Sequence, residues 1–216
     1  MQPPDSLRDR VLAAAAATPS AGRVQTRRTA AIGYLSASAA MLGVFAWAGG
    51  IDHAAGRPLE YTLAIASGAA VIAAIVGLWA FGRGNSMVGR PPRVLIAVAA
   101  AAPVAVFLWL VAWHPHYVDP SVRVGYRCLG LTLALAAGLL SVSLYLRRHS
   151  VALAPQAHGA ALGAASGAIA GVLVDLWCPL TEPAHVLVGH VLPIVLLAGV
   201  AAVVGGNLLR VRAQIS

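Results

Sequence analysis

The sequence predicts an all-α membrane protein, folded as a bundle of six transmembrane helices. Hydrophobic residues make up 59% of the 216 residues, charged residues make up 10%, and the mean hydropathy is +0.80. Such a chain is too apolar to fold around a water-facing surface. Six segments each hold the roughly 20 mostly apolar residues that a helix needs to cross about 30 Å of hydrocarbon. They lack the alternating pattern of barrel strands, and a helix satisfies its backbone groups within one segment.

The six predicted spans follow one another with short connections. In chain order they cover residues 29–49, 61–81, 94–113, 124–146, 156–177 and 186–209. Tryptophan rings prefer the membrane–water interface, and the first, second, third and fifth spans end near Trp47, Trp79, Trp113 and Trp177. The fourth and sixth spans end before pairs of arginines instead. Because no connection is long enough to hold a separate domain, we expect one compact bundle.

The arginines predict how the bundle is oriented, because short loops rich in basic residues stay in the cytoplasm. All 15 basic residues are arginines. Twelve lie on the side that holds both termini: Arg8, Arg10, Arg23, Arg27, Arg28, Arg83, Arg90, Arg93, Arg147, Arg148, Arg210 and Arg212. The other side holds Arg57, Arg123 and Arg127. We therefore expect cytoplasmic N- and C-termini, and the formal charge of +8 gives no separate indication of direct nucleic-acid binding.

The fifth span carries a glycine at every fourth position, namely Gly159, Gly163, Gly167 and Gly171. This small-xxx-small ladder is typical of a helix that a neighbour approaches closely. Its string GAASG also resembles the serine motif of intramembrane rhomboid proteases, with His190 as a conceivable base. However, Ser166 is predicted near the membrane centre and His190 only about one turn inside its outer boundary. A packing ladder is therefore the favoured interpretation, ahead of a membrane-embedded hydrolase.

Cysteines and histidines gather at the predicted outer face. The candidates for a sensor site are Cys178, His185, His190, Cys128, His114 and His116. Imidazole and thiolate together bind zinc or another divalent metal. The spacing lacks CxxC or HxxxH, and His185 and His190 stand about 140° apart on an ideal helix. We therefore predict that they do not share a face, unless Pro193 loosens that turn by clashing with the carbonyl of Gly189. Two alternatives stay open: a Cys128–Cys178 disulfide, and polar groups that only cap helices and solvate loops.

The polar N-terminal segment predicts a short amphipathic helix. Its cap is Asp5 or Ser6, and it stops at Pro19. Leu7 and Val11 share one face with two alanines further along the helix. A helix this short is marginal alone in water. We expect it to lie on the membrane surface, or to dock its apolar face into a groove of a cytoplasmic protein.

Two stretches of the chain resemble the NrsF-type polytopic anti-sigma factors, which are negative regulators of extracytoplasmic-function (ECF) sigma factors. The first is LRDRVLAAAAATP followed by RVQTRR, and the second is AGVLVDLWCPLTEPAHVLVGHVLPIVLLAGVAAVVGG. Together with the six-span layout, the resemblance covers nearly the full length. It implies a protein without enzymatic activity in the bacterial inner membrane, which holds a sigma factor away from core polymerase until a stress signal releases it.

This resemblance also implies a division of labour along the chain. Residues 1–28 become a cytoplasmic sigma-binding segment, residues 29–209 the six-helix membrane domain, and residues 210–216 a cytoplasmic tail. The residues expected to contact the sigma factor are Leu7, Arg8, Arg10, Val11 and Leu12. The other partner is the lipid bilayer, and no cofactor is required, although the outer face could hold a divalent metal such as zinc. The alternative function is a small six-helix transporter or a metal- or redox-handling membrane protein.

Overall fold

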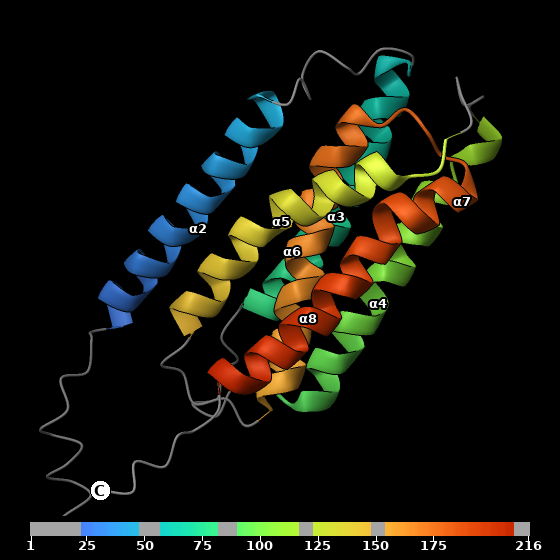
Figure 1. Ribbon diagram of the computed structural model, residues 1–216. Helices are drawn as coiled ribbons and strands as arrows, with labels where there is room; N and C mark the ends of the chain where they lie inside the picture. Colours follow the sequence, from blue (N-terminus) through green and yellow to red (C-terminus); the bar gives the residue numbers. More distant parts are fainter. Residues whose placement is uncertain (1–22, 48–56, 82–89, 117–122, 148–153, 210–216) are drawn as a thin grey trace, which may run out of the picture.

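The computed structural model describes residues 23–47, 57–81, 90–116, 123–147 and 154–209 (Figure 1). Within these ranges all regular structure is helical, which confirms the all-α part of the predicted fold class. The long helices are α2 (Arg23–Trp47), α3 (Leu59–Phe81), α4 (Pro92–Val111), α5 (Tyr126–Arg147), α6 (Pro155–Trp177) and α8 (Leu192–Leu208). The short ones are η1 (His114–His116), α7 (Pro183–Val186) and the π-helical η2 (Leu187–Val191). Elements α7, η2 and α8 follow one another without a gap and form one broken helix, Pro183–Leu208.

Five helices are long and apolar enough to cross a membrane, so the protein is a multi-pass membrane protein. They cover Leu59–Phe81, Pro92–His116, Tyr126–Arg147, Pro155–Trp177 and Pro183–Leu208. Their ends differ from those of the predicted second to sixth spans by at most three residues. The remaining long helix, α2, has 25 residues and begins at Arg23, inside the basic segment that was predicted to precede the first span.

Helix α6 forms the centre of the bundle. In its apolar window 72% of the residues are buried, against 28% to 44% in the other four spanning helices. It packs against α3, α4, α5 and α8, whereas α2 lies at the side and packs mainly against α5 (Figure 1). Because α6 consists largely of glycine and alanine, its neighbours can approach its backbone from several directions.

The predicted glycine ladder is confirmed at three of its four positions. A Cβ atom on Gly159 would lie 2.0 Å from the carbonyl oxygen of Ala201, and one on Gly163 would lie 2.2 Å from that of Leu197. Gly167 also faces α8, with 3.0 Å to the Cα atom of Ile194. We call this contact the glycine seam. A Cβ on Gly171 would meet nothing within 4 Å, so its place in the ladder was predicted wrongly: one turn beyond Ile194 the partner helix widens into η2.

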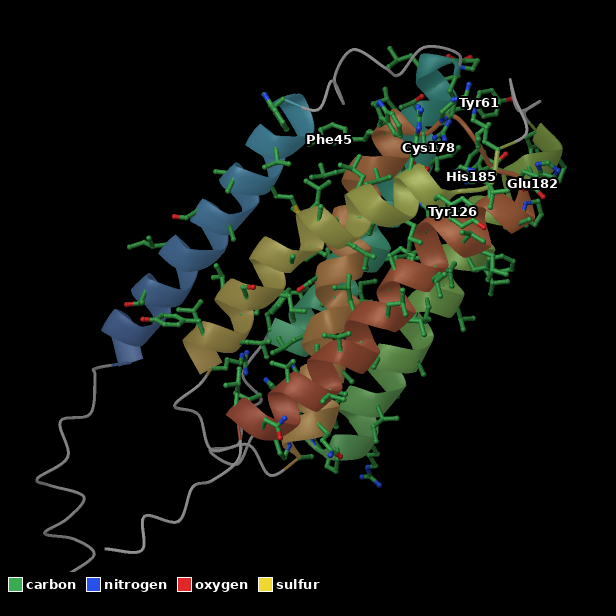
Figure 2. All side chains as sticks on the ribbon, in the orientation of Figure 1. Phe45, Tyr61, Tyr126, Cys178, Glu182 and His185 are labelled. Carbon is green, nitrogen blue, oxygen red and sulfur yellow. The ribbon has the colours of Figure 1, made fainter. Side chains whose placement is uncertain are left out.

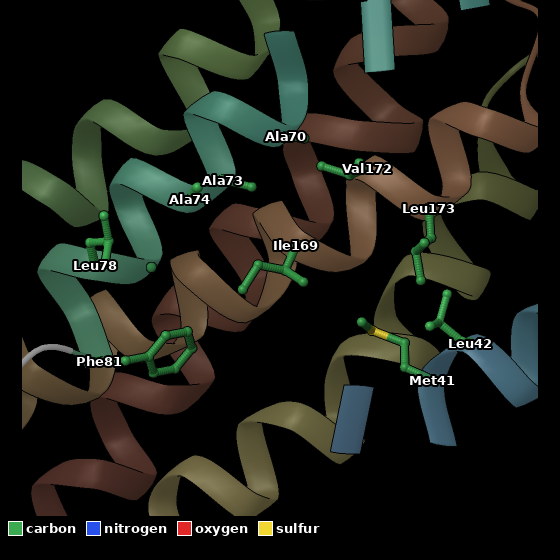
Figure 3. Close-up of a pocket in the computed structure, with 11 residues that line it drawn as sticks. Met41, Leu42, Ala70, Ala73, Ala74, Leu78, Phe81, Ile169, Val172 and Leu173 are labelled. Carbon is green, nitrogen blue, oxygen red and sulfur yellow. The ribbon is translucent and has the colours of Figure 1, made fainter. Parts of the chain in front are cut away.

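An apolar cavity of about 720 Å³ lies between α2, α3 and α6 (Figure 3). Its lining consists of Met41, Leu42, Ala70, Ala73, Ala74, Gly77, Leu78, Phe81, Ile169, Val172 and Leu173. No lining residue carries a titratable side chain or a side-chain hydrogen-bond donor. The groups able to bind polar ligands or to react therefore lie elsewhere in the described bundle, and the largest cluster of potential metal ligands lies where α6 turns into α7.

Candidate functional site

The hairpin between α6 and α7 contains Pro179 and Pro183 and is fixed by a helix cap at Glu182. Helix α6 ends at Trp177, and Cys178 leaves it with extended backbone. The carboxylate of Glu182 then accepts hydrogen bonds from the backbone N–H groups of Ala184, at 3.1 Å, and His185, at 2.7 Å. These bonds, first that from His185, lower the pKa of Glu182. They fix the start of α7 and with it the position of the His185 side chain, labelled in Figure 2.

The turn η2 brings His190 to the same side of the helix as His185. Pro193 has no N–H to bond with the carbonyl of Gly189, so the regular α-helical pattern is interrupted there. Residues Leu187–Val191 instead form a π-turn, in which residues five apart are joined by a hydrogen bond. The two histidine rings lie 5.8 Å apart between centroids. The prediction for an ideal α-helix, that they do not share a face, is therefore wrong, because the turn before Pro193 is a π-turn.

A contact between two glycines brings Cys128 to this turn. A Cβ atom on Gly125 would lie 2.6 Å from both the nitrogen and the Cα atom of Gly189. A Cβ on Gly189 would in turn lie 3.0 Å from the Cβ of Cys128. Because neither residue has a side chain, the start of α5 can lie directly on η2. Cys128 follows Gly125 by three residues, and its thiol therefore faces the two histidines.

Four of the six predicted sensor residues come together here, and we call them the Cys2His2 cluster. One potential ligand atom from each of Cys128, Cys178, His185 and His190 lies within 4.8 Å of the others. The Nε2 atom of His185 is 3.1 Å from the Sγ of Cys178 and 3.6 Å from the Sγ of Cys128. All four residues are between 1% and 3% exposed. They are therefore not the solvated loop groups that one of the alternatives assumed.

The two histidines differ in how their nitrogens are used. Nδ1 of His185 lies 2.7 Å from the carbonyl oxygen of Arg123. A carbonyl only accepts, so Nδ1 carries the hydrogen and the Nε2 lone pair points at the thiols. Neither ring nitrogen of His190 makes a hydrogen bond to any described residue, although both are buried. A buried imidazole without a partner is rare, because desolvating its nitrogens costs free energy.

Both cysteines of the cluster are free thiols. The alternative of a Cys128–Cys178 disulfide is thus not realised in the structure, although the two thiols are neighbours. The hydrogen bond with Cys128, followed by burial, raises the pKa of the Cys178 thiol above its ordinary value.

A buried ion pair borders the cluster. Nη1 of Arg57 lies 3.4 Å from Oδ2 of Asp175, and both side chains are only 3% exposed. The same guanidinium donates through Nη2 to the carbonyl oxygen of Cys178. The pair therefore ties the segment before α3 to the end of α6. The arginine distribution placed Arg57 only by its side of the membrane and did not indicate Asp175 as its partner.

The other predicted residues lie apart from the cluster or outside the described residues. His114 and His116 are exposed on η1 and do not belong to the group of four. Leu7, Arg8, Arg10, Val11 and Leu12 all lie outside the described residues. The Ser166 hydroxyl and the His190 ring form no hydrogen bond with each other or with any residue of the described ranges. They lack the contact through which a base activates a serine.

One comparison with known proteins covers most of the chain. The family model described as "NrsF: Negative regulator of sigma F" matches residues 12–211. No curated protein and no solved structure matches.

Proposed function

The chain belongs to the NrsF family of negative regulators of sigma F, and from this premise we propose that it is an inner-membrane anti-sigma factor for an ECF sigma factor. The family match is the observation that carries the proposal. Family membership makes the protein a negative regulator whose partner is a sigma factor. Inhibition by occlusion follows from the location: a sigma factor held at the membrane cannot engage core polymerase, and no catalytic step is needed.

We propose six spans, with α2 as the first and both termini in the cytoplasm. The start of α2 and the end of α8 lie at one end of the bundle, and the labelled residues Cys178 and His185 lie at the other (Figures 1 and 2). Arg23, Arg27 and Arg28 stand in the first turns of α2, as expected for a helix that enters the membrane from the cytoplasm. The proposed division is residues 1–28, 29–209 and 210–216.

The N-terminal segment is the proposed sigma-binding element. Support comes from its sequence pattern, in which Leu7 and Val11 share an apolar face that is suited to a protein groove. Arg8 and Arg10 would meet acidic groups of the sigma factor or of lipid headgroups. The family match starts at Leu12, so the other four proposed contact residues precede the matched range and rest on this pattern alone.

The Cys2His2 cluster is the proposed sensor, at the end of the bundle opposite the sigma factor. It brings both cysteines of the chain and two buried imidazoles together in one place. In the glycine seam α6 contributes no side chain at three positions, so α8 lies close to its backbone, and a change at the η2 end would move two closely packed helices. A signal that alters the cluster would then weaken the hold on the sigma factor.

Co-purification from the native host tests the sigma-binding part. We expect that Leu7→Asp combined with Val11→Asp, which places charge on the apolar face, lowers recovery of the sigma factor at least tenfold. Asp9→Ala, on another face of the same predicted helix, serves as the matched control and should leave recovery unchanged. Recovery of the sigma factor in normal yield with a chain that lacks residues 1–28 would rule the segment out as the binding element.

A reporter for sigma-dependent transcription tests the sensor part. We expect Cys178→Ser, His185→Ala and His190→Ala to change induction by oxidative or metal stress, while His116→Ala, outside the cluster, leaves it unaltered. If the three cluster variants are induced to the same level as the wild type, the cluster has no part in sensing.

A further inference from the structure

We propose that Cys128, Cys178, His185 and His190 are the four ligands of one zinc ion, bound in tetrahedral coordination. Binding itself follows from the geometry of the site, and its regulatory meaning rests on the function proposed above. Such an ion would be a resident part of the outer end of the bundle, and it would hold together elements that are far apart in the sequence.

The donor set selects the ion. Two thiolates and two imidazoles suit zinc, whereas calcium and magnesium require oxygen ligands. Zinc–sulfur bonds of about 2.3 Å and zinc–nitrogen bonds of about 2.05 Å place sulfur and nitrogen ligands roughly 3.6 Å apart in a tetrahedron. Nε2 of His185 lies 3.1 Å and 3.6 Å from the two Sγ atoms, and all four ligand atoms fit within 4.8 Å. Small side-chain movements complete a tetrahedron.

The surroundings of the ligands match those of structural metal sites. A histidine that binds a metal almost always donates its second N–H to a carbonyl or carboxylate, which orients the ring. His185 does so through the carbonyl of Arg123. His190 is 1% exposed, and neither of its ring nitrogens has a hydrogen-bond partner in the part of the chain that the structure describes. A metal bond to one of these nitrogens would give that nitrogen the partner it lacks, while the other nitrogen stays without one among the described residues.

Charge balance also favours a divalent ion. Two thiolates neutralise Zn²⁺, and the neighbouring Arg57–Asp175 pair is already neutral by itself. The loaded site therefore adds no net charge to a nearly water-free end of the membrane domain, where an isolated charge is costly. Metal binding deprotonates a coordinating thiol outright.

The four ligands come from four elements: Cys128 from α5, Cys178 from the α6–α7 loop, His185 from α7 and His190 from η2. Zinc bound here would fasten α5 to the last hairpin, directly where Gly125 and Gly189 touch. Loss or exchange of the ion would release this fastening at the η2 end of α8. The proposed sensor would thus read the state of one metal centre rather than of a lone thiol.

Metal analysis of the full-length protein in detergent tests the inference. Elemental mass spectrometry should find about one zinc per chain, and Cys128→Ser, Cys178→Ser, His185→Gln and His190→Gln should each lower zinc affinity at least tenfold. His114→Gln and His116→Gln are the matched controls and should bind zinc normally. After exchange for Co²⁺, the wild-type protein should show both a thiolate charge-transfer band and the intense d–d bands of a tetrahedral site.

Three results would overturn the proposal: wild-type protein that contains no zinc, zinc binding by His190→Gln at wild-type affinity, or a wild-type Co²⁺ spectrum without the thiolate band. The Co²⁺ spectrum needs no variant, so a misfolded substitution does not obscure the answer. A zinc-free protein that still retains its sigma factor through residues 1–28 would refute the metal site but leave the proposed function intact. A protein that binds zinc but whose recovery of a sigma factor does not depend on residues 1–28 would support the metal site and refute the proposed sigma-binding segment.

Discussion

The glycine seam and the Cys2His2 cluster, both formed by the last broken helix, bring chain segments together in opposite ways. In the glycine seam, α8 lies against α6 because Gly159, Gly163 and Gly167 have no side chains. In the Cys2His2 cluster, a few residues away, η2 meets α5 and four polar side chains converge without filling their bonding capacity. The seam is complete as it stands, whereas the cluster has nitrogen and sulfur atoms left to bind something else.

This difference separates a structural contact from a functional one. In the seam the two helices already lie too close to admit a further Cβ atom, so a change there alters only how well the helices pack. In the cluster, His190 is buried without a hydrogen bond among the described residues, which lowers stability unless a ligand compensates for it. We therefore expect substitutions in the seam to affect folding most, and substitutions around the cluster to affect binding as well.

The largest effect is expected for Gly163→Ala. Its new Cβ would lie 2.2 Å from the backbone oxygen of Leu197, and a backbone atom cannot rotate away, so α6 and α8 must separate. We expect the free energy of unfolding to fall by about 4 kcal/mol, at the upper end of the cost of overpacking. Denaturation in mixed micelles measures it.

Gly171→Ala is the matched control for the seam, since nothing lies within 4 Å of its Cβ position. It should be neutral or slightly stabilising, because alanine is the better helix former by up to about 1 kcal/mol. Equal stability of Gly163→Ala and Gly171→Ala would show that the seam is not a close backbone contact.

The second effect concerns the ion pair that supports the cluster. Asp175→Asn leaves the buried guanidinium of Arg57 without its counter-charge, and we expect a loss of about 3 kcal/mol in the free energy of unfolding. The double variant with Arg57→Met should be more stable than the sum of the two single losses predicts, because no unpaired charge remains. Strict additivity in this double-mutant cycle would contradict the ion pair.

The third effect links packing to the cluster. Gly125→Ala would place its Cβ 2.6 Å from Gly189 and so push the start of α5 away from η2. We expect a loss of about 2 kcal/mol together with faster alkylation of the Cys128 thiol, which is 3% exposed. Gly130→Ala, with nothing within 4 Å, should change neither quantity. Unaltered thiol reactivity in Gly125→Ala would mean that this contact does not position Cys128.

The smallest effect is expected for Glu182→Ala, which removes the cap of α7 at a cost of about 1 kcal/mol. The pKa of Glu182 lies below its ordinary value of 4.5 when the protein is folded, through the hydrogen bonds from His185 and Ala184. The cap's electrostatic contribution is therefore complete above pH 4.5 and disappears as the pH falls through the lowered pKa. The stability difference between wild type and variant should shrink over that range; a pH-independent difference would contradict it.

The parts of the fold that depend on local pattern could be predicted from the sequence. Uninterrupted apolar runs predicted the spanning helices closely, because hydrocarbon imposes both the length and the backbone hydrogen bonding of a span. The cysteines and two of the four histidines proposed as sensor residues do meet, since loops at the same membrane face are close in space. His114 and His116 share that predicted face but stand on a separate exposed turn.

The remaining features depend on contacts that no local pattern encodes. Arg57 and Asp175 are 118 residues apart, and nothing near either residue identifies the other as its partner. Pro193 indicated that the helix could be loosened near Gly189, because a proline removes one of its hydrogen bonds. It did not indicate that the result is a π-turn that turns both histidines to one side. The close approach of Gly125 to Gly189 likewise appears only once the helices are packed.

The π-turn at Leu187–Val191 also allows the two halves of one broken helix to be rotated independently about the helix axis. One extra residue in a turn acts as a phase shift, since each residue of an α-helix advances the rotation by about 100°. The half that follows the turn can keep Ile194, Leu197 and Ala201 on α6, while the half that precedes it presents His185 to the thiols. Deleting one residue of the turn would rotate the segment that carries His185 by about 100° away from the thiols. The residues of α8 that pack on the glycine seam would keep their positions.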